Sequence, residues 1–213
     1  MKIVFTRLFV LAVCLFAAPV CAFAADLVVS VTDAAGKPVS SAVVTFTPTG
    51  GAAVPAGLKT AVYTLTQKSL KFAPYVLAVP AGATVNFPNQ DRVNHHVYSF
   101  SKVQPFQFPL YGQGKTRTMK FDHAGTVAVA CNIHDSMSAY IRVIDTPYFA
   151  MTDISGRVTL KGVPDAAGTL SVWQPLMDAP EHTVSRALNA GKSPAQTFSV
   201  KVRDGGFPIS GAY

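Results

Sequence analysis

The feature that most constrains the fold is a succession of short apolar runs with strand-type composition, separated by turn sequences rich in Gly, Pro and Asp. The runs span residues 27–31, 41–46, 76–79, 84–87, 96–100, 116–121, 126–131 and 140–144. Turn signals such as Pro80-Ala81-Gly82 and His123-Ala124-Gly125 fall between them. Helical periodicity is scarce. This spacing predicts an all-β fold of the antiparallel sandwich or barrel type.

The N-terminal segment, residues 1–24, has the pattern of a secretory signal peptide. Two basic residues, Lys2 and Arg7, precede an apolar run over 8–18, and Ala22-Phe23-Ala24 forms a small-residue cleavage pattern. The apolar run is too short to span a bilayer comfortably, and no later stretch is a transmembrane candidate. We therefore expect a periplasmic protein without a membrane span, whose mature chain starts at or near Ala25.

The charge distribution argues against a nucleic-acid partner. The sequence has 18 Lys and Arg against 11 Asp and Glu, and removal of the two basic leader residues leaves 16 against 11, a formal charge of +5. The basic residues are scattered singly, without the runs or interleaved aromatics of a nucleic-acid-binding stripe. An anionic redox partner is compatible with this charge, although solubility alone explains it.

Removal of the expected leader leaves one cysteine in the mature protein. Cys14 and Cys21 lie in the leader, so the mature protein keeps only Cys131 and forms no disulfide framework. Lipid attachment at Cys21 is disfavoured because the preceding Ala18-Pro19-Val20 lacks the small residues that lipoprotein processing usually needs. A lone cysteine is commonly just a small buried apolar residue. The neighbours of Cys131 therefore decide its role.

Those neighbours form a motif of metal-binding side chains. Cys131, His134 and Met137 place a thiolate, an imidazole and a thioether three residues apart in turn, where a strand end and a tight loop can bring them to one point. Soft sulfur ligands favour copper, and two His, one Cys and a weak axial Met form the blue-copper arrangement. The segment ahead of Val97 supplies a second histidine, His95 or His96. Only one of the two can aim inward, because neighbouring strand residues point to opposite faces.

Further patterned residues accompany this motif. They are Phe72-x-Pro74, Gly82-x-x-Val85-x-Phe87-x-Asn89, a histidine before Val97, and Phe121-x-x-x-Gly125 ahead of Cys131-x-x-His134-x-x-Met137. With these patterns, residues 70–144 resemble the plastocyanin, amicyanin and azurin family of cupredoxins, and the gaps of the last motif are most similar to amicyanin. The resemblance implies a Greek-key cupredoxin sandwich holding one copper ion, Cu(I) or Cu(II). The implied ligands are His95, Cys131, His134 and Met137. His96 stands where the family has Asn, and it stays the alternative to His95.

The flanking segments carry a second, weaker resemblance, to the transthyretin-like sandwich of carboxypeptidase regulatory domains. Its two halves begin at Asp33-x-x-Gly36-x-Pro38 and Asp153-x-x-Gly156, about a hundred residues apart, which suggests that the central domain is inserted into a loop of the flanking one. The expected organisation is a signal peptide over 1–24, half a sandwich over 26–50, the cupredoxin domain over 60–146, and the second half with a C-terminal tail over 147–213. The alternative is one larger sandwich with ordinary Gly and Pro turns.

The resemblance implies electron transfer without catalysis. Four protein ligands leave the metal no obvious open position. The five histidines include no His-x-His pair of the kind that multicopper oxidases and nitrite reductases cluster, and no second cysteine lies near Cys131 for a binuclear centre. We therefore expect a non-enzymatic carrier for redox partners such as a dehydrogenase or a cytochrome.

Electrons are expected to pass through a surface patch around Ile133 and Met137, with Pro105, Phe106 and Phe108 as further candidates. The alternative function is a periplasmic copper-binding or copper-delivery protein. Clusters of exchangeable Met or His ligands would favour that alternative, and the sequence has none beyond this site. A cupredoxin scaffold without metal is disfavoured because every ligand position is filled.

Overall fold

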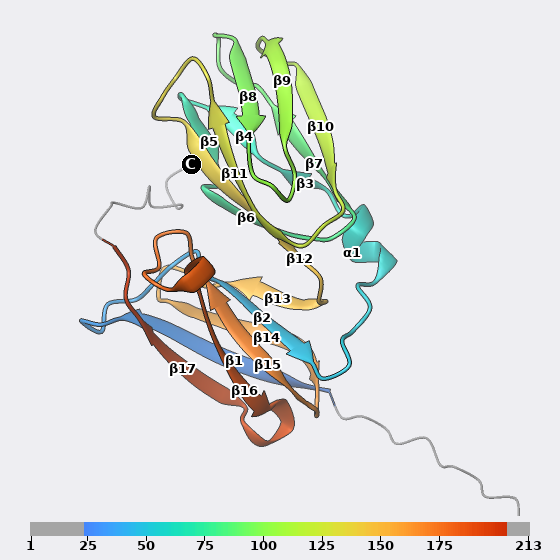
Figure 1. Ribbon diagram of the computed structural model, residues 1–213, viewed down its shortest axis with the longest axis vertical. Helices are drawn as coiled ribbons and strands as arrows, with labels where there is room; N and C mark the ends of the chain where they lie inside the picture. Colours follow the sequence, from blue (N-terminus) through green and yellow to red (C-terminus); the bar gives the residue numbers. More distant parts are fainter. Residues whose placement is uncertain (1–23, 204–213) are drawn as a thin grey trace, which may run out of the picture.

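The computed structural model describes residues 24–203, which form strands, loops and a few short helical turns. The all-β expectation is confirmed for this part of the chain. Figure 1 shows the strands in two groups, with β3 to β12 above and β1, β2 and β13 to β17 below. Within the described residues, no helix is long and apolar enough to cross a membrane. The expected leader lies outside the described residues, apart from Ala24.

The upper group contains two sheets and a hairpin. Its strands are β3 (Tyr63–Thr64), β4 (Thr66–Lys68), β5 (Lys71–Ala73), β6 (Val76–Pro80), β7 (Ala83–Pro88), β8 (His95–Ser99), β9 (Phe106–Tyr111), β10 (Thr116–Phe121), β11 (Gly125–Cys131) and β12 (Ser138–Ile144). The sheet orders are β6-β12-β11-β8-β9 and β10-β7-β3, and β4 pairs with β5. Alternation along the strands places one side chain in two inside, as with Val127, Val129 and Cys131 of β11. The resulting core includes Phe87, Phe121 and Ile141.

The lower group joins strands from both ends of the described chain. Its members are β1 (Ala24–Asp33), β2 (Val43–Pro48), β13 (Tyr148–Met151), β14 (Arg157–Pro164), β15 (Ala167–Trp173), β16 (Thr183–Asn189) and β17 (Ala195–Val200). The sheet orders are β14-β1-β17 and β13-β2-β15-β16. Side chains of these strands, including Val29, Phe46, Leu160 and Leu170, form a core of their own.

The Thr152 hydroxyl holds the two distant parts of this group together. Its Oγ1 donates a hydrogen bond to the carbonyl of Val39 at 2.7 Å and accepts one from the amide of Ala42 at 2.9 Å. Two similar aspartate turns lie nearby, since Asp33 and Asp153 each accept amide hydrogen bonds from residues two and four positions further on. These side-chain bonds fix the loop ends that the sequence marked only as Gly and Pro turns.

A small apolar cluster joins the two groups of strands. Val43 and Trp173 from the lower group pack with Val76 and Ile144 from the upper group. The guanidinium of Arg142 lies 5.4 Å from the ring centroid of Trp173. Burial lowers the pKa of this guanidinium.

Several elements differ from the sequence expectations. The Gly- and Pro-rich segment after residue 49 contains the short helix α1 (Ala56–Thr60), and two 3-10 turns, η1 (Pro180–His182) and η2 (Ala190–Lys192), flank β16. Strand β9 was not predicted. It contains Pro109, which is tolerated because β9 is an edge strand that needs no amide donor on its outer side.

Candidate metal centre

The candidate metal ligands lie where two neighbouring strands approach one end of the upper group. Strand β8 begins at His95, and β11 ends at Cys131. Cys131 pairs with Val97 across these strands, so His95, two residues before Val97 and on the same buried face, lies beside the thiol. The loop between β11 and β12 then supplies His134 and Met137. The sheet register, not the distance along the sequence, unites these residues.

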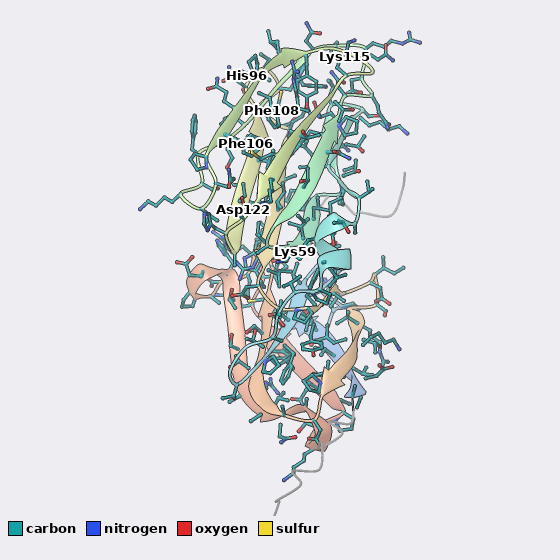
Figure 2. All side chains as sticks on the ribbon, turned by 90° about the vertical axis from the view of Figure 1, so that its right-hand side faces the viewer. Lys59, His96, Phe106, Phe108, Lys115 and Asp122 are labelled. Atoms are coloured by element: carbon teal, nitrogen blue, oxygen red, sulfur yellow. The ribbon has the colours of Figure 1, made fainter. Side chains whose placement is uncertain are left out.

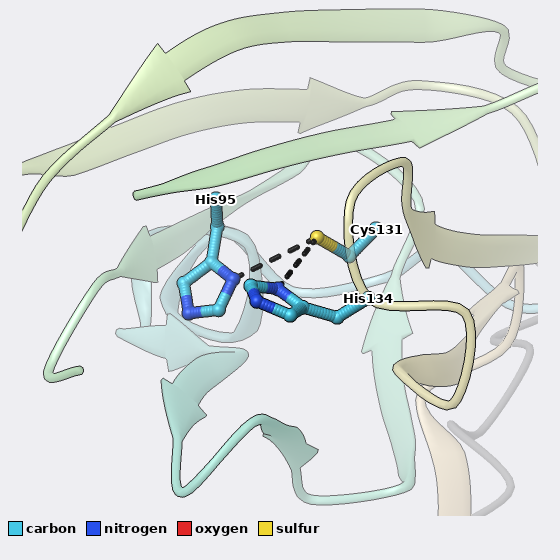
Figure 3. A group of neighbouring side chains, drawn as sticks. All are labelled: His95, Cys131 and His134. Atoms are coloured by element: carbon cyan, nitrogen blue, oxygen red, sulfur yellow. Dashed lines mark hydrogen bonds between the residues drawn. The ribbon is translucent and has the colours of Figure 1, made fainter. Parts of the chain in front are cut away.

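Both histidines direct the same ring nitrogen toward the thiol (Figure 3). His95 Nδ1 lies 3.6 Å from Cys131 Sγ, and His134 Nδ1 lies 3.7 Å from it. All three candidate ligand atoms lie within 4.8 Å of one another. A metal ion can contact three atoms at such separations simultaneously, because its bonds to nitrogen and sulfur are about 2.0–2.3 Å long.

Met137, the fourth candidate ligand, lies at the end of the loop between β11 and β12. Its carbonyl accepts a hydrogen bond from the Cys131 amide at 3.2 Å, and its amide donates to the carbonyl of His134 at 2.9 Å. The Met137 side chain is 1% exposed and packs in the same core cluster as Cys131. The loop therefore folds back on itself and keeps the thioether on the buried side of the site.

His96, the alternative ligand, takes no part in the cluster. Its Nε2 accepts a hydrogen bond from Gln107 Nε2 on strand β9 at 2.7 Å. Its ring stands 6.2 Å from that of Tyr98. His95 is fully buried, whereas His96 is only partly buried, as alternation along β8 requires. The geometry thus places His95, and not His96, beside the thiol.

Asp91 is a candidate positioning residue that the sequence did not point to. Its Oδ2 lies 2.9 Å from His95 Nε2, and its carboxylate accepts amide hydrogen bonds from Ser69 at 2.6 Å and Leu70 at 3.1 Å. Burial raises the pKa of Asp91, but the hydrogen bonds from Leu70, His95 and Ser69 outweigh it and leave this pKa below its ordinary value. An ionised Asp91 accepts a hydrogen bond from the Nε2–H of His95, which leaves the Nδ1 lone pair free to bind a metal.

A buried polar network holds the loop that carries Asp91. Asn89 Nδ2 donates to the carbonyls of Val93 and Tyr111, and Asn89 Oδ1 accepts from the Asp91 amide. The Tyr111 hydroxyl donates to the Phe87 carbonyl at 3.0 Å and accepts from Gln67 Nε2 at 2.6 Å. Burial raises the pKa of Tyr111 to about 12, although the Gln67 bond acts in the opposite direction. These bonds pre-position the ligand loop.

One sequence expectation about the surface is wrong. Phe106 and Phe108 are only 8% and 9% exposed and pack into the core against Phe87, with ring centroids 5.7 and 5.3 Å away. Strand β9 turns both rings inward because alternate residues share one face. Met137 is buried as well, so the exposed apolar side chain of the ligand loop is Ile133. Pro105 is exposed, as expected.

The donor set fits one type 1 copper ion. Two imidazoles, a thiolate and a thioether combine soft sulfur with borderline nitrogen, the combination that suits copper. His95, Cys131, His134 and Met137 would hold the ion. Residues 63–144 thus have a cupredoxin fold with a His-Cys-His copper site, and the chain adds further β-sheets to it.

Comparisons with known proteins gave structural similarities only. No protein-family model matches the chain, and no curated protein matches it. The copper-containing nitrite reductase from Thermus scotoductus SA-01 is similar at 28% identity and a TM-score of 0.38 over 44% of this chain. The match covers 25% of that chain, so the matched part of this protein spans about a quarter of the enzyme's length.

Two smaller proteins are also similar over part of this chain. A novel purple cupredoxin from Nitrosopumilus maritimus matches at 21% identity and a TM-score of 0.36, covering 38% of this chain and 99% of that chain. A mutant of amicyanin in the Cu(I) state matches at 21% identity and a TM-score of 0.38, covering 47% of this chain and 98% of that chain.

Proposed function

We propose that this chain is an exported type 1 copper protein that carries single electrons between periplasmic redox partners. The observation that carries the proposal is the cluster of Cys131 Sγ, His95 Nδ1 and His134 Nδ1, in which Cys131 and His95 are buried and beside which Met137 is buried as well. Bound copper supplies a one-electron couple between Cu(II) and Cu(I). The protein contributes an enclosed ligand set that is already assembled, so little rearrangement accompanies the change of charge.

Each ligand has a distinct part in this function. The Cys131 thiolate would provide the most covalent bond and the strongest electronic coupling, while His95 and His134 would supply the two further close ligands. Met137 would be the weak fourth ligand and would tune the potential together with the apolar surroundings of the sulfur. Asp91 orients the ring of His95 through the 2.9 Å contact.

The enclosed site favours a carrier over an enzyme. Four protein side chains leave no obvious position for a substrate. Among the residues that the structure describes, the His95, Cys131 and His134 group is the one cluster with metal-ligand geometry, so the additional copper centre of a multicopper enzyme is not seen there. Burial of His95 and Cys131 also favours retention of the ion over the ready exchange that copper delivery needs.

Four exposed apolar side chains lie on segments near the candidate ligands and suit brief docking of a redox partner. We define this end patch as Leu70, Val93, Leu110 and Ile133, which are 43%, 44%, 55% and 47% exposed. Ile133 precedes the ligand His134, and Leu110 precedes Tyr111, the strand partner of His95. His134 is only partly buried, and its ring is the proposed route by which electrons leave.

Protein-film voltammetry of the copper-loaded protein tests the proposal. A reversible one-electron wave with one copper per chain is expected. Absence of a wave, together with rapid loss of Cu(I) to a competing chelator, would contradict electron transfer and favour copper delivery. Steady reduction of nitrite by the purified chain would contradict the non-enzymatic role. Intact-mass measurement of periplasmic material tests export, for which the expected first residue is at or near Ala25.

A further inference from the structure

Five exposed basic side chains lie around the copper end of the molecule, the end at which His95 begins β8. They are Lys68, Lys71, Arg92, Lys115 and Arg117, and we call them the basic rim. Figure 2 shows His96 and Lys115 together at the end farthest from the lower strands, with Lys59 and Asp122 toward the middle of the molecule. The lower strands therefore leave this end uncovered.

Each member of the basic rim is linked, by sequence position or by a direct contact, to residues that hold the candidate ligands in place. Lys68 and Lys71 are strand partners that flank the Ser69-Leu70 turn bound by Asp91. Arg92 follows Asp91 in the sequence, and the Lys115 carbonyl accepts a hydrogen bond from the Asn89 amide at 2.9 Å. The Arg117 guanidinium lies 5.4 Å from the ring centroid of Tyr111. The same loops thus position the ligands and the basic side chains.

The positive charge of the rim is poorly compensated. Within residues 24–203 none of the five side chains forms an ion pair, whereas Lys120, Lys161 and Lys201 pair with Asp122, Asp26 and Asp178. Two acidic residues belong to the segments at the copper end. Asp91 is engaged by His95 and two amides, and Asp135 is exposed in the ligand loop. The rim therefore presents five cations against one free carboxylate.

We propose that the basic rim and the end patch together form the docking surface for a redox protein whose own contact surface is acidic. This inference rests on the proposed electron-transfer function and adds the charge of the partner. Rim charges steer an oppositely charged protein toward the surface and raise its association rate, while apolar contact at the centre brings the two redox centres close. The rim residues come from three separate segments, namely the β4–β5 hairpin, the loop between β7 and β8, and the chain from Lys115 into β10. Charges spread over three segments suit contact with a protein surface better than a pocket for a small anion.

The first test compares two oxidants of opposite charge. In stopped-flow experiments the reduced, copper-loaded protein gives one electron to ferricyanide, which becomes ferrocyanide, or to tris(phenanthroline)cobalt(III), which becomes cobalt(II), as Cu(I) becomes Cu(II). Between ionic strengths of about 10 and 150 mM the ferricyanide rate constant should fall several-fold and the cobalt rate constant should rise, because salt screens attraction and repulsion alike.

Matched variants separate the position of the charges from the net charge. The double variant Lys68→Glu/Lys71→Glu should lower the low-salt ferricyanide rate constant about tenfold and raise that for the cobalt complex. Lys37→Glu/Lys192→Glu changes the net charge equally at exposed, unpaired lysines of the lower group and should alter either constant less than twofold. Arg92→Glu/Lys115→Glu provides a second rim variant if the first does not fold, as judged by its visible spectrum.

A binding measurement tests the partner class without electron transfer. Addition of a decaglutamate peptide to the Cu(I) protein should shift amide NMR signals of residues 68–71, 92 and 115, and the rim variants should lose this effect. Equal behaviour of the rim and control variants, or peptide shifts outside the rim, would overturn the acidic-partner inference. Failure to react with either oxidant would instead overturn the proposed electron-transfer function.

Discussion

His95 Nε2 and Asp91 Oδ2 lie 2.9 Å apart, and the same carboxylate binds the amides of Ser69 and Leu70. Both turn residues have positive φ values, 54° and 56°, in the left-handed region that favours glycine. One carboxylate therefore orients a copper ligand and satisfies the amides of a hairpin turn that lacks glycine. Copper ligation and the geometry of the β4–β5 hairpin are linked through Asp91.

Replacing Asp91 by Asn should raise the reduction potential. The change removes a partly buried negative charge that stabilises Cu(II) more than Cu(I), so we expect a rise on the order of tens of millivolts and weaker Cu(II) binding. Voltammetry and a Cu(II) competition titration measure the two effects. The control Asp135→Asn removes an exposed carboxylate next to His134 and should change the potential less, because solvent screens it. Equal shifts in both variants would contradict a specific role for Asp91.

The two adjacent histidines should behave differently when each is replaced by Ala. His95→Ala removes a close ligand and should abolish or strongly alter the visible spectrum. His96→Ala removes only the contact with Gln107 and should leave the spectrum and the copper stoichiometry nearly unchanged. Optical titration with Cu(II) distinguishes the variants. A spectrum lost in His96→Ala and kept in His95→Ala would show that His96, and not His95, is the ligand.

Replacing Met137 by Leu should keep the colour and raise the potential. Leucine matches the volume of methionine closely, so the core should tolerate the change at a cost below about 1.5 kcal/mol. Loss of the weak thioether ligand removes a donor that favours Cu(II), and the strong Cys131 bond remains. Voltammetry and the visible spectrum measure both outcomes. A colourless variant with normal copper content would show that Met137 is essential to the site.

Residues 60–146 should fold and bind copper when expressed alone. Their core is separate from that of the lower strands, and the two groups meet chiefly through the small cluster around Trp173. The fragment should melt at a lower temperature than the full chain, because Val76 and Ile144 lose the packing of Val43 and Trp173 and become exposed to solvent. A fragment that cannot bind copper would show that the insertion hypothesis is wrong or that the domains depend on each other.

Trp173→Ala in the full chain provides the matched control for that experiment. Removing this nearly buried side chain should destabilise the protein by about 3–5 kcal/mol, while the visible spectrum stays unchanged. Thermal unfolding followed separately by copper colour and by far-UV circular dichroism measures both effects.

The sequence allowed prediction of features with a strong local signal. Alternating strands such as 116–121 were placed correctly because their flanking turns are explicit. The Cys131-x-x-His134-x-x-Met137 spacing predicted a metal-binding loop because three donors follow a single strand end. The choice between His95 and His96 needed the register of β8 against β11, which sets the face that each residue occupies.

Other features depend on tertiary contacts that the sequence does not display. Asp91 lies four residues before His95 in a loop, where that spacing has no fixed geometry, and its other partners are amides about twenty residues upstream. The burial of Phe106 and Phe108 follows from the pairing of β9 with β8, and Pro109 obscured the strand pattern. The strands β3 and β4 are too short to give a periodic signal.

The most direct test of the copper site is the visible absorption spectrum of the purified protein on addition of Cu(II), compared with that of Cys131→Ser. The wild-type protein should develop an intense blue or green colour that saturates at one copper per chain, because the colour arises from the Cu(II)–thiolate bond. Cys131→Ser should lose that absorption even if it still binds copper through His95 and His134. An uncoloured wild-type complex, or full colour in Cys131→Ser, would contradict the type 1 copper assignment.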